Sequence, residues 1–285
     1  MPTARRRERD GAAREPRKKG TSDLIPRIIV AVPAVAFAVL IIWQGEWVFA
    51  AGIGALALVC VHELSVMFER ARPVRLAAMI AVVGLVVAGT AGDERQVLLA
   101  LVCSVPLVFA LALAMPQRER ITASIAVTML MIVWIGLGVA HAAMLRGLEH
   151  GGALVVMVLL GTFFGDTFAY FGGRLLGRHK LAPVISPNKT WEGLACGIVI
   201  GTLVVWYWSR TYSGDGWISG IDGLLLGLAV TIAAPIGDLF ESLIKRDMEV
   251  KDTGTLFGAH GGALDRLDAV MFTAVVGFYV WLALT

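Results

Sequence analysis

The sequence predicts an all-α, polytopic integral membrane protein with about nine transmembrane helices. Hydrophobic residues make up 57% of the 285 residues, charged residues make up only 16%, and the mean hydropathy is +0.75. Apolar segments of about 20 residues, long enough to cross the hydrocarbon core, follow one another along most of the chain. A soluble globular domain does not need this composition, so the polytopic membrane class is the one that fits.

The first 23 residues differ from the rest of the chain. Residues 1–23 interleave Arg and Lys with Glu, Gly and Pro, a composition that cannot form a core, so we predict a disordered basic tail. Such a tail suits the anionic cytoplasmic surface of a membrane. The apolar run that follows spans a bilayer and ends without a small-residue cleavage site, so we expect a helix rather than a signal peptide.

Residues 24–285 form the predicted transmembrane domain. Its nine apolar segments comprise residues 24–43, 46–68, 74–91, 96–115, 121–145, 151–171, 192–209, 220–241 and 265–284. Of the 25 Lys and Arg residues, 22 lie in the tail and in alternate connections, whereas Arg95, Arg146 and Arg210 lie in the others. The positive-inside rule then places the amino terminus and the polar loops 172–190 and 242–265 in the cytoplasm, and the carboxyl terminus outside.

The early segments carry few polar groups. Glu63, in the second segment, is a carboxylate at membrane depth that needs a partner. It could support the residues of a site from behind, line the site itself, or make an interhelical hydrogen bond that fixes packing, and we favour packing. The three cysteines, Cys60, Cys103 and Cys196, fall inside predicted helices without metal-ligand spacing, so we expect small buried hydrophobic side chains.

The sixth segment changes character. Residues 161–173 are rich in glycine and other small residues, which allow helices to pack closely in a membrane. Asp166 lies in the cytoplasmic half of this segment. An unpaired acid in hydrocarbon would cost a few kcal/mol, so we predict that Asp166 faces a polar cavity.

The following loop suits an anion. Pro183 and Pro187 stop helix formation and shape a turn. Hydrogen-bond donors then cluster just before the helix expected to start near Trp191; they are Ser186, Asn188, Lys189 and Thr190. Donors at a helix start favour phosphate, although the same pattern could serve only as an N-cap. The chain has no Walker loop and no G-x-G-x-x-G motif, so any nucleotide is held in another way.

The most polar stretch is Gly237–Asp268. Helical spacing puts Asp238, Glu241, Ser242 and Lys245 on one face, and a glycine-rich segment, residues 251–262, then separates that helix from the one beginning at Asp265. Carboxylates from both helix ends can bind a divalent cation. Basic side chains could surround phosphate oxygens; they are Lys245, Arg246, Lys251, His260 and Arg266.

Two simpler interpretations of the stretch remain. A solvated basic loop would explain the Lys and Arg residues, but not Asp238 and Glu241 directly after an apolar run. Alternatively, Asp238 could do no more than pair with Lys245, two turns further along the same helix. In that case Asp238 would not bind a metal.

The polar stretch has a family resemblance. From Ser242 to Asp268 it reads S-L-I-K-R, four further residues, then K-D-T-G-T-L-F-G-A-H-G-G-A-L-D-R-L-D. This resembles the signature of the phosphatidate cytidylyltransferases, also called CDP-diacylglycerol synthases. Ala263 stands where that family usually carries a larger aliphatic residue, which affects packing rather than chemistry. Residues 165–193 resemble the second recurring block of the same family.

The resemblance implies an activity and a site. It implies a membrane-embedded catalytic domain, residues 24–285, that converts CTP and phosphatidic acid into CDP-diacylglycerol and pyrophosphate. It also implies a homodimer in the cell membrane, no nucleic acid, and Mg²⁺ held by Asp238 and Asp265, with a second cation left open. Lys245, Arg246 and Lys251 would share in catalysis. The substrate-binding residues would be Ser186, Asn188, Lys189, Thr190, Ser242, Asp252, His260, Arg266, Asp268 and Asp166.

Two other function classes stay open from the residues. A CTP-dependent lipid kinase would need a base for a neutral hydroxyl, and Asp166 or Asp252 could be that base. An ion-coupled transporter could use Asp166, Asp238 and Glu241 as a relay. A transporter binds its substrate near the midplane, however, whereas these groups are expected at the cytoplasmic edge.

Overall fold

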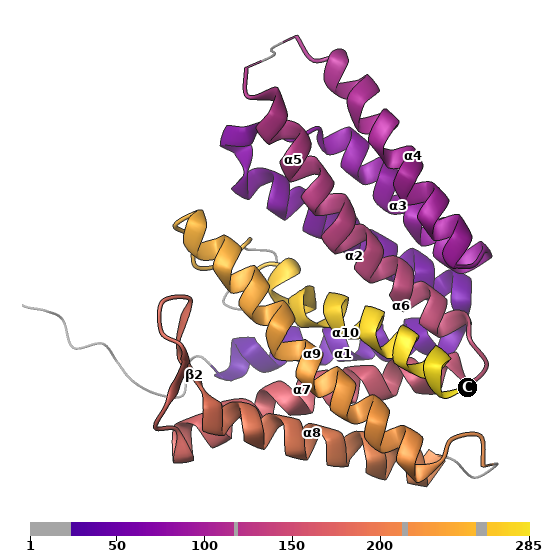
Figure 1. Ribbon diagram of the computed structural model, residues 1–285, viewed down its shortest axis with the longest axis vertical. Helices are drawn as coiled ribbons and strands as arrows, with labels where there is room; N and C mark the ends of the chain where they lie inside the picture. Colours follow the sequence, from indigo (N-terminus) through magenta and orange to yellow (C-terminus); the bar gives the residue numbers. More distant parts are fainter. Residues whose placement is uncertain (1–23, 117–118, 213–215, 255–260) are drawn as a thin grey trace, which may run out of the picture.

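The computed structural model describes residues 24–116, 119–212, 216–254 and 261–285, and no side chains for residues 24–31 or 212. The described chain is almost entirely helical (Figure 1). Its α-helices are α1 Leu24–Gln44, α2 Glu46–Met67, α3 Arg75–Ala91, α4 Glu94–Leu113, α5 Ile121–Met131, α6 Leu137–Gly147, α7 Gly151–Leu176, α8 Trp191–Tyr212, α9 Gly220–Asp247 and α10 Leu264–Leu284.

The predicted all-α membrane fold is confirmed. Each of the nine predicted segments coincides with a helix, and the fifth is a continuous stretch in which a π-helical turn, Ile132–Gly136, joins α5 to α6. Within the described residues, 7 helical stretches are long and apolar enough to cross a membrane. The helices α1 and α3 contribute shorter apolar stretches, so nine spans remain a prediction.

Helix starts follow local capping rules. The side chain of Asp93 accepts hydrogen bonds from the backbone N–H groups of Arg95 and Gln96, and Gln96 reaches back to the N–H of Asp93. Ser219 and Asp222 form the same reciprocal arrangement at the start of α9. These capping boxes satisfy N–H groups that have no partner inside the helix. Apolar residues then carry each helix onward.

Small residues bring α7 and α8 close together, as the sequence predicted. A Cβ atom on Gly197 would lie 2.5 Å from the carbonyl oxygen of Gly165, and one on Gly193 would lie 2.5 Å from that of Ala169. Contacts this short show that the two backbones pack directly against each other. The interface fixes the direction of α7, which carries Asp166.

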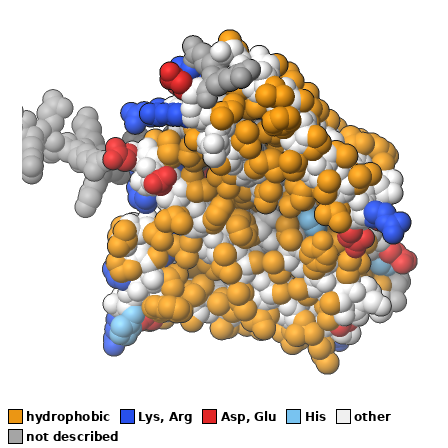
Figure 2. Space-filling model, turned by 45° about the horizontal axis from the view of Figure 1, so that its top comes forward, with side chains coloured by type: hydrophobic (Ala, Val, Ile, Leu, Met, Phe, Trp, Pro, Cys, Tyr) orange, Lys and Arg blue, Asp and Glu red, His pale blue; other side chains and the backbone are white. Residues whose placement is uncertain are grey.

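The helices form two neighbouring groups. In Figure 1, α2–α6 lie towards the top and α7 and α8 towards the bottom, α9 slants from the lower right to the upper left, and α10 runs between α9 and α6. Hydrophobic side chains cover most of the face in Figure 2, and charged side chains gather towards its margins. This surface suits a chain embedded in a bilayer. The C-terminal end of α9 and the hairpin between α7 and α8 lie on the same side of Figure 1, away from the carboxyl terminus.

The hairpin was not expected. The sequence predicted a polar loop over residues 172–190, but α7 continues to Leu176, and the strands β1 Lys180–Ala182 and β2 Ser186–Thr190 pair antiparallel. The expected turn lies between the strands. The helix start at Trp191 is the predicted one, and Thr190 caps it by accepting a hydrogen bond from Gly193 N at 3.1 Å.

Candidate active site

Three helices bring five carboxylates to one region. The acids are Asp166 on α7, Asp238 and Glu241 on α9, and Asp265 and Asp268 on α10. The C-terminal end of α9 and the N-terminal end of α10 meet here, and α9 and α10 pack against each other. Several of these groups are buried, so their charges need partners.

Lys245 joins the two helix ends. Its Nζ lies 2.6 Å from Glu241 Oε2, one turn earlier on α9, and 2.8 Å from Asp265 Oδ1 on α10. The side chains are 13%, 2% and 6% exposed for Lys245, Glu241 and Asp265 respectively. The lysine thus neutralises two buried carboxylates and ties α9 to α10. The proposed pairing of Lys245 with Asp238 is wrong, because both of its described ion pairs go to other acids.

Asp265 is held on both oxygens. Its Oδ1 contacts Lys245, and its Oδ2 accepts hydrogen bonds from Thr253 N at 2.9 Å, Thr253 Oγ1 at 3.0 Å and Gly262 N at 2.7 Å. The backbone of Gly261 takes a positive φ of 81°, which favours glycine, and so the chain can turn around this carboxylate. The glycine-rich segment therefore fixes the orientation of Asp265.

Asp238 connects α9 to the hairpin. Lys189 Nζ, on β2, lies 2.7 Å from Asp238 Oδ2, and Ser242 Oγ donates to Asp238 Oδ1 at 3.2 Å. Arg246 Nε donates to the carbonyl oxygen of Ile185 at 3.2 Å, a second link between the same elements. The structure thus brings together residues from the two polar segments that the sequence singled out.

Asp166 and Asp268 complete the acidic group. Asp166 is partly buried, and it interacts electrostatically with Asp238, Asp268 and Lys189. Glu241 interacts in the same way with Asp268. In the described part of the chain, Glu241 Oε1 is buried and has no hydrogen-bond donor. Asp166 therefore faces other polar groups rather than lipid.

The remaining predicted residues lie around this group or outside it. Ser186 is partly buried and Asn188 is exposed, both on β2. Lys251, Asp252 and Arg266 have exposed positions near the helix ends. His260 lies outside the described residues. Their predicted contacts with substrate stay predictions.

The donor set suits a hard cation, with a rearrangement. Carboxylate oxygens are the ligands that Mg²⁺ prefers, and the unpartnered Glu241 Oε1 is an acceptor in need of a positive charge. Among the described residues, no three His, Cys, Asp or Glu side chains are close enough together to hold an ion as they stand. Asp238 and Asp265 are instead each paired with a lysine, which a cation would have to displace.

Sequence reasoning gave two groups too little weight. The sequence favours a packing role for Glu63, and the structure shows that its carboxylate accepts from the backbone N–H groups of Ala263 and Leu264, directly before Asp265. Thr253 also belongs to the site, because both its N–H and its hydroxyl bind Asp265. The sequence feature that could have identified Glu63 is an acid at membrane depth. No feature of the local sequence points to Thr253.

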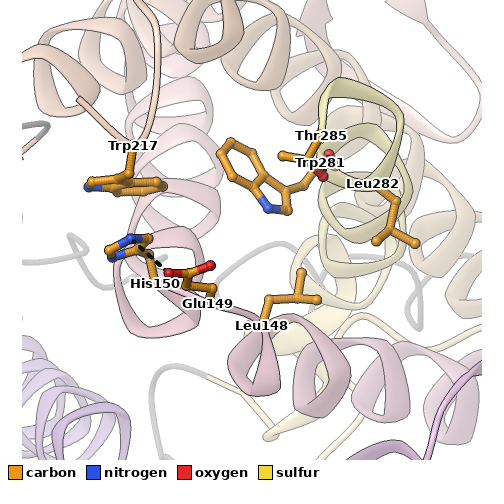
Figure 3. Close-up of a pocket in the computed structure, with 7 residues that line it drawn as sticks. All are labelled: Leu148, Glu149, His150, Trp217, Trp281, Leu282 and Thr285. Carbon is orange, nitrogen blue, oxygen red and sulfur yellow. Dashed lines mark hydrogen bonds and ion pairs between the residues drawn. The ribbon is translucent and has the colours of Figure 1, made fainter. Parts of the chain in front are cut away.

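A separate pocket lies at the other end of the same helices. It has a volume of about 390 Å³ and lies among the start of α7, the segment before α9 and the end of α10. In Figure 3 the rings of His150 and Trp217 face each other, with centroids 4.4 Å apart, and Trp281 lies beside them. Aromatic residues are typical of a membrane–water interface, and the predicted site residues are absent from its lining.

The chain resembles a family model over almost all of its length and individual known proteins over about half of it. The model of a family described as the cytidylyltransferase family matches residues 25–284. Proteins named phosphatidate cytidylyltransferase are 36% identical over 175 residues in Mycobacterium leprae, 39% over 134 residues in Haemophilus influenzae and 39% over 149 residues in Brucella abortus.

These alignments cover part of each protein. They span 61%, 46% and 51% of this chain and 54%, 45% and 53% of the relatives, respectively. The chain thus matches about half the length of the curated relatives. The family model, in contrast, covers almost all of the chain, including every described residue of the acidic group. The chain therefore belongs to the cytidylyltransferase family.

Proposed function

We propose that the protein is a phosphatidate cytidylyltransferase, which converts CTP and phosphatidic acid into CDP-diacylglycerol and pyrophosphate. The observation that carries the proposal is the buried arrangement of Lys245, Glu241 and Asp265, tied through α9 to Asp238 and Lys189. Such a group of acids and bases is costly at the ends of apolar helices unless it is used. The names of the relatives supply the substrate pair.

The reaction joins two anions. A phosphate oxygen of phosphatidic acid attacks the α-phosphorus of CTP and forms a new P–O bond. The bond between the α-phosphorus and the oxygen that bridges it to the β-phosphorus breaks, and pyrophosphate leaves. The nucleophile is already ionised near neutral pH, so no strong general base is required. The protein must chiefly neutralise charge and align the groups.

The basic side chains supply that neutralisation. Lys189 and Arg246 lie at the junction of the hairpin and α9, where both side chains are held in place by contacts with the other element. Lys245 is positioned between α9 and α10. We assign these three residues to the phosphate oxygens, with Lys251 and Arg266 around them. Ser186, Asn188, Thr190 and Ser242 then act as neutral donors.

The acids have a different role. Asp238 and Asp265 would hold Mg²⁺, which when bound supplies positive charge to phosphate oxygens. Their present lysine partners would then be released towards the substrates. Glu241 holds Lys245 and stabilises its positive charge, and Asp166 and Asp268 are assigned to substrate binding. Asp252 and His260 are proposed to contact substrate from the glycine-rich segment.

The membrane setting serves the lipid substrate. The chain is a membrane-embedded helical protein, and exposed apolar side chains such as Phe163 and Phe164 lie on α7 near Asp166. Acyl chains can lie along such a surface while the phosphate reaches the polar group. We propose a cell-membrane homodimer with the site on the cytoplasmic side.

Reconstitution tests the proposal. The purified protein in vesicles that contain phosphatidic acid should form CDP-diacylglycerol, identified by mass, when CTP and Mg²⁺ are added. Omitting either CTP or phosphatidic acid should abolish the product, and so should Asp265→Asn. Glu149→Gln, at an exposed position at the opposite end of the helices, should retain most activity. Product that forms equally well in the Asp265→Asn protein would overturn the assignment of the site.

A further inference from the structure

We propose that Glu63, on α2, is a positioning residue whose buried carboxylate sets the first turn of α10 and therefore the place of Asp265. The proposal rests on the proposed function of the Asp265 site. It goes beyond a role in packing alone, because the partners of Glu63 are backbone N–H groups at the start of α10, directly before Asp265, rather than another helix side chain.

The hydrogen bonds of Glu63 reach a point far along the chain. Its Oε1 accepts from Ala263 N at 3.0 Å and its Oε2 accepts from Leu264 N at 3.0 Å, across 200 and 201 residues. The first N–H groups of a helix have no partner inside it, and the helix dipole favours a negative charge there. The N-cap residue of α10 is Ala263, whose side chain makes no capping hydrogen bond to these N–H groups. Glu63 therefore supplies the cap that the local sequence lacks.

Two glycines make room for this carboxylate. A Cβ atom on Gly254 would overlap Glu63, and all three of its nearest atoms would belong to that side chain. The same is true of Gly262. Gly254 and Gly262 thus both lie against Glu63, and a larger residue at either position would have to displace the carboxylate.

Gly262 links Glu63 to the reaction site. Its backbone contacts the Glu63 carboxylate, and its N–H donates to Asp265 Oδ2 at 2.7 Å. Asp265 in turn contacts Lys245. A shift of Glu63 would therefore move both the donor to Asp265 and the helix turn that carries it. Glu63 is 6% exposed and both its oxygens are engaged, so it acts through its neighbours rather than on substrate.

Kinetics of Glu63 variants test this role. Glu63→Ala should lower kcat about 100-fold, the scale expected when a reacting group is displaced by about an ångström, and should change KM for CTP much less. Glu63→Gln keeps one acceptor oxygen, so its kcat should fall by about tenfold. Ser65→Ala is the matched control: Ser65 is buried on the same helix and donates only to Val61 O and the Met131 sulfur.

A double-mutant cycle tests the geometry. Gly254→Ala adds a methyl group whose three nearest atoms all belong to Glu63, so it should cost at least about tenfold in kcat when Glu63 is present. In the Glu63→Ala background the space is open, and the same substitution should cost little more. If the kcat losses of Glu63→Ala and Gly254→Ala simply multiply in the double variant, the proposal is overturned. A normal kcat in folded Glu63→Ala protein would overturn it as well.

Hydrogen exchange separates this inference from the proposed function. Without any substrate, the amides of Ala263 and Leu264 should exchange at least about tenfold faster in Glu63→Ala than in wild type or Ser65→Ala, because both lose their acceptor. Faster exchange in a protein that has no cytidylyltransferase activity would support the positioning role and reject the proposed function. Unchanged exchange at both amides would reject the positioning role, whatever the activity.

Discussion

Replacement of Lys245 by methionine should destabilise the protein strongly. Lys245 is the only cation that the described structure pairs with Glu241 and Asp265, and all three side chains are at most 13% exposed. Removing one partner of a buried ion pair costs about 3–5 kcal/mol, because a charge is left without compensation. Asp265 keeps its three hydrogen-bond donors, whereas Glu241 keeps none in the described structure. Most of the cost should therefore come from Glu241.

The prediction can be measured by unfolding in mixed micelles, followed by tryptophan fluorescence. Lys245→Met should lower the free energy of unfolding by about 3–5 kcal/mol, and Glu241→Gln added to it should restore at least about half of that loss. Turnover should stay low in the double variant, because Lys245 is also assigned to phosphate. Lys251→Met, at an exposed position, is the control, and a change of at most about 0.5 kcal/mol is expected there.

A loss below about 1 kcal/mol in Lys245→Met would refute the reasoning, since an exposed pair gives that value. It would mean that Lys245 does not neutralise buried carboxylates in the folded protein. Failure of Glu241→Gln to recover stability would show that the cost comes from Asp265 or from lost packing of the lysine stem instead.

Three further predictions follow from the site and the helix packing. Asp238→Asn and Asp265→Asn should each reduce kcat at least about 100-fold, and the double variant should be hardly worse, because residues that act as a unit are non-additive; multiplying losses in steady-state kinetics would separate them. Gly197→Ala should cost about 1–3 kcal/mol of unfolding free energy by forcing α7 and α8 apart, whereas Gly84→Ala, where no atom lies within 4 Å of the new methyl, should be neutral. A carboxyl-terminal reporter that is active only in the cytoplasm should stay silent, and a bright signal would mean that the number of spans is even rather than odd.

Local signals in the sequence were sufficient for the helices. Apolar length predicted the segments, and the spacing of Asp238, Glu241 and Lys245 predicted their common face, since both are properties of one helix. The end of an apolar run underestimated helix length, because α9 continues through charged residues to Asp247. The start of α8 after Thr190 was predicted correctly because the proline and capping signals there are local.

Partners across helices could not be predicted in the same way. Lys245 could reach several acids, and only the meeting of α9 with α10 selects Glu241 and Asp265 over Asp238. Lys189 reaches Asp238 through a hairpin that the sequence pattern did not indicate. Glu63 lies 200 residues before its partner Ala263, so no local pattern could connect them. Tertiary contacts therefore decided the pairings within the site.

The position of the label transferred from CTP tests the central claim most directly. Purified protein is incubated with phosphatidic acid, Mg²⁺ and CTP labelled with ³²P at either the α- or the γ-phosphate, and the lipid is then extracted and counted. The proposed reaction predicts that the α-label enters lipid while the γ-label is released as pyrophosphate. Entry of the γ-label into lipid would indicate a CTP-dependent kinase, and absence of both labels would indicate no transfer to lipid; either result would contradict the cytidylyltransferase assignment.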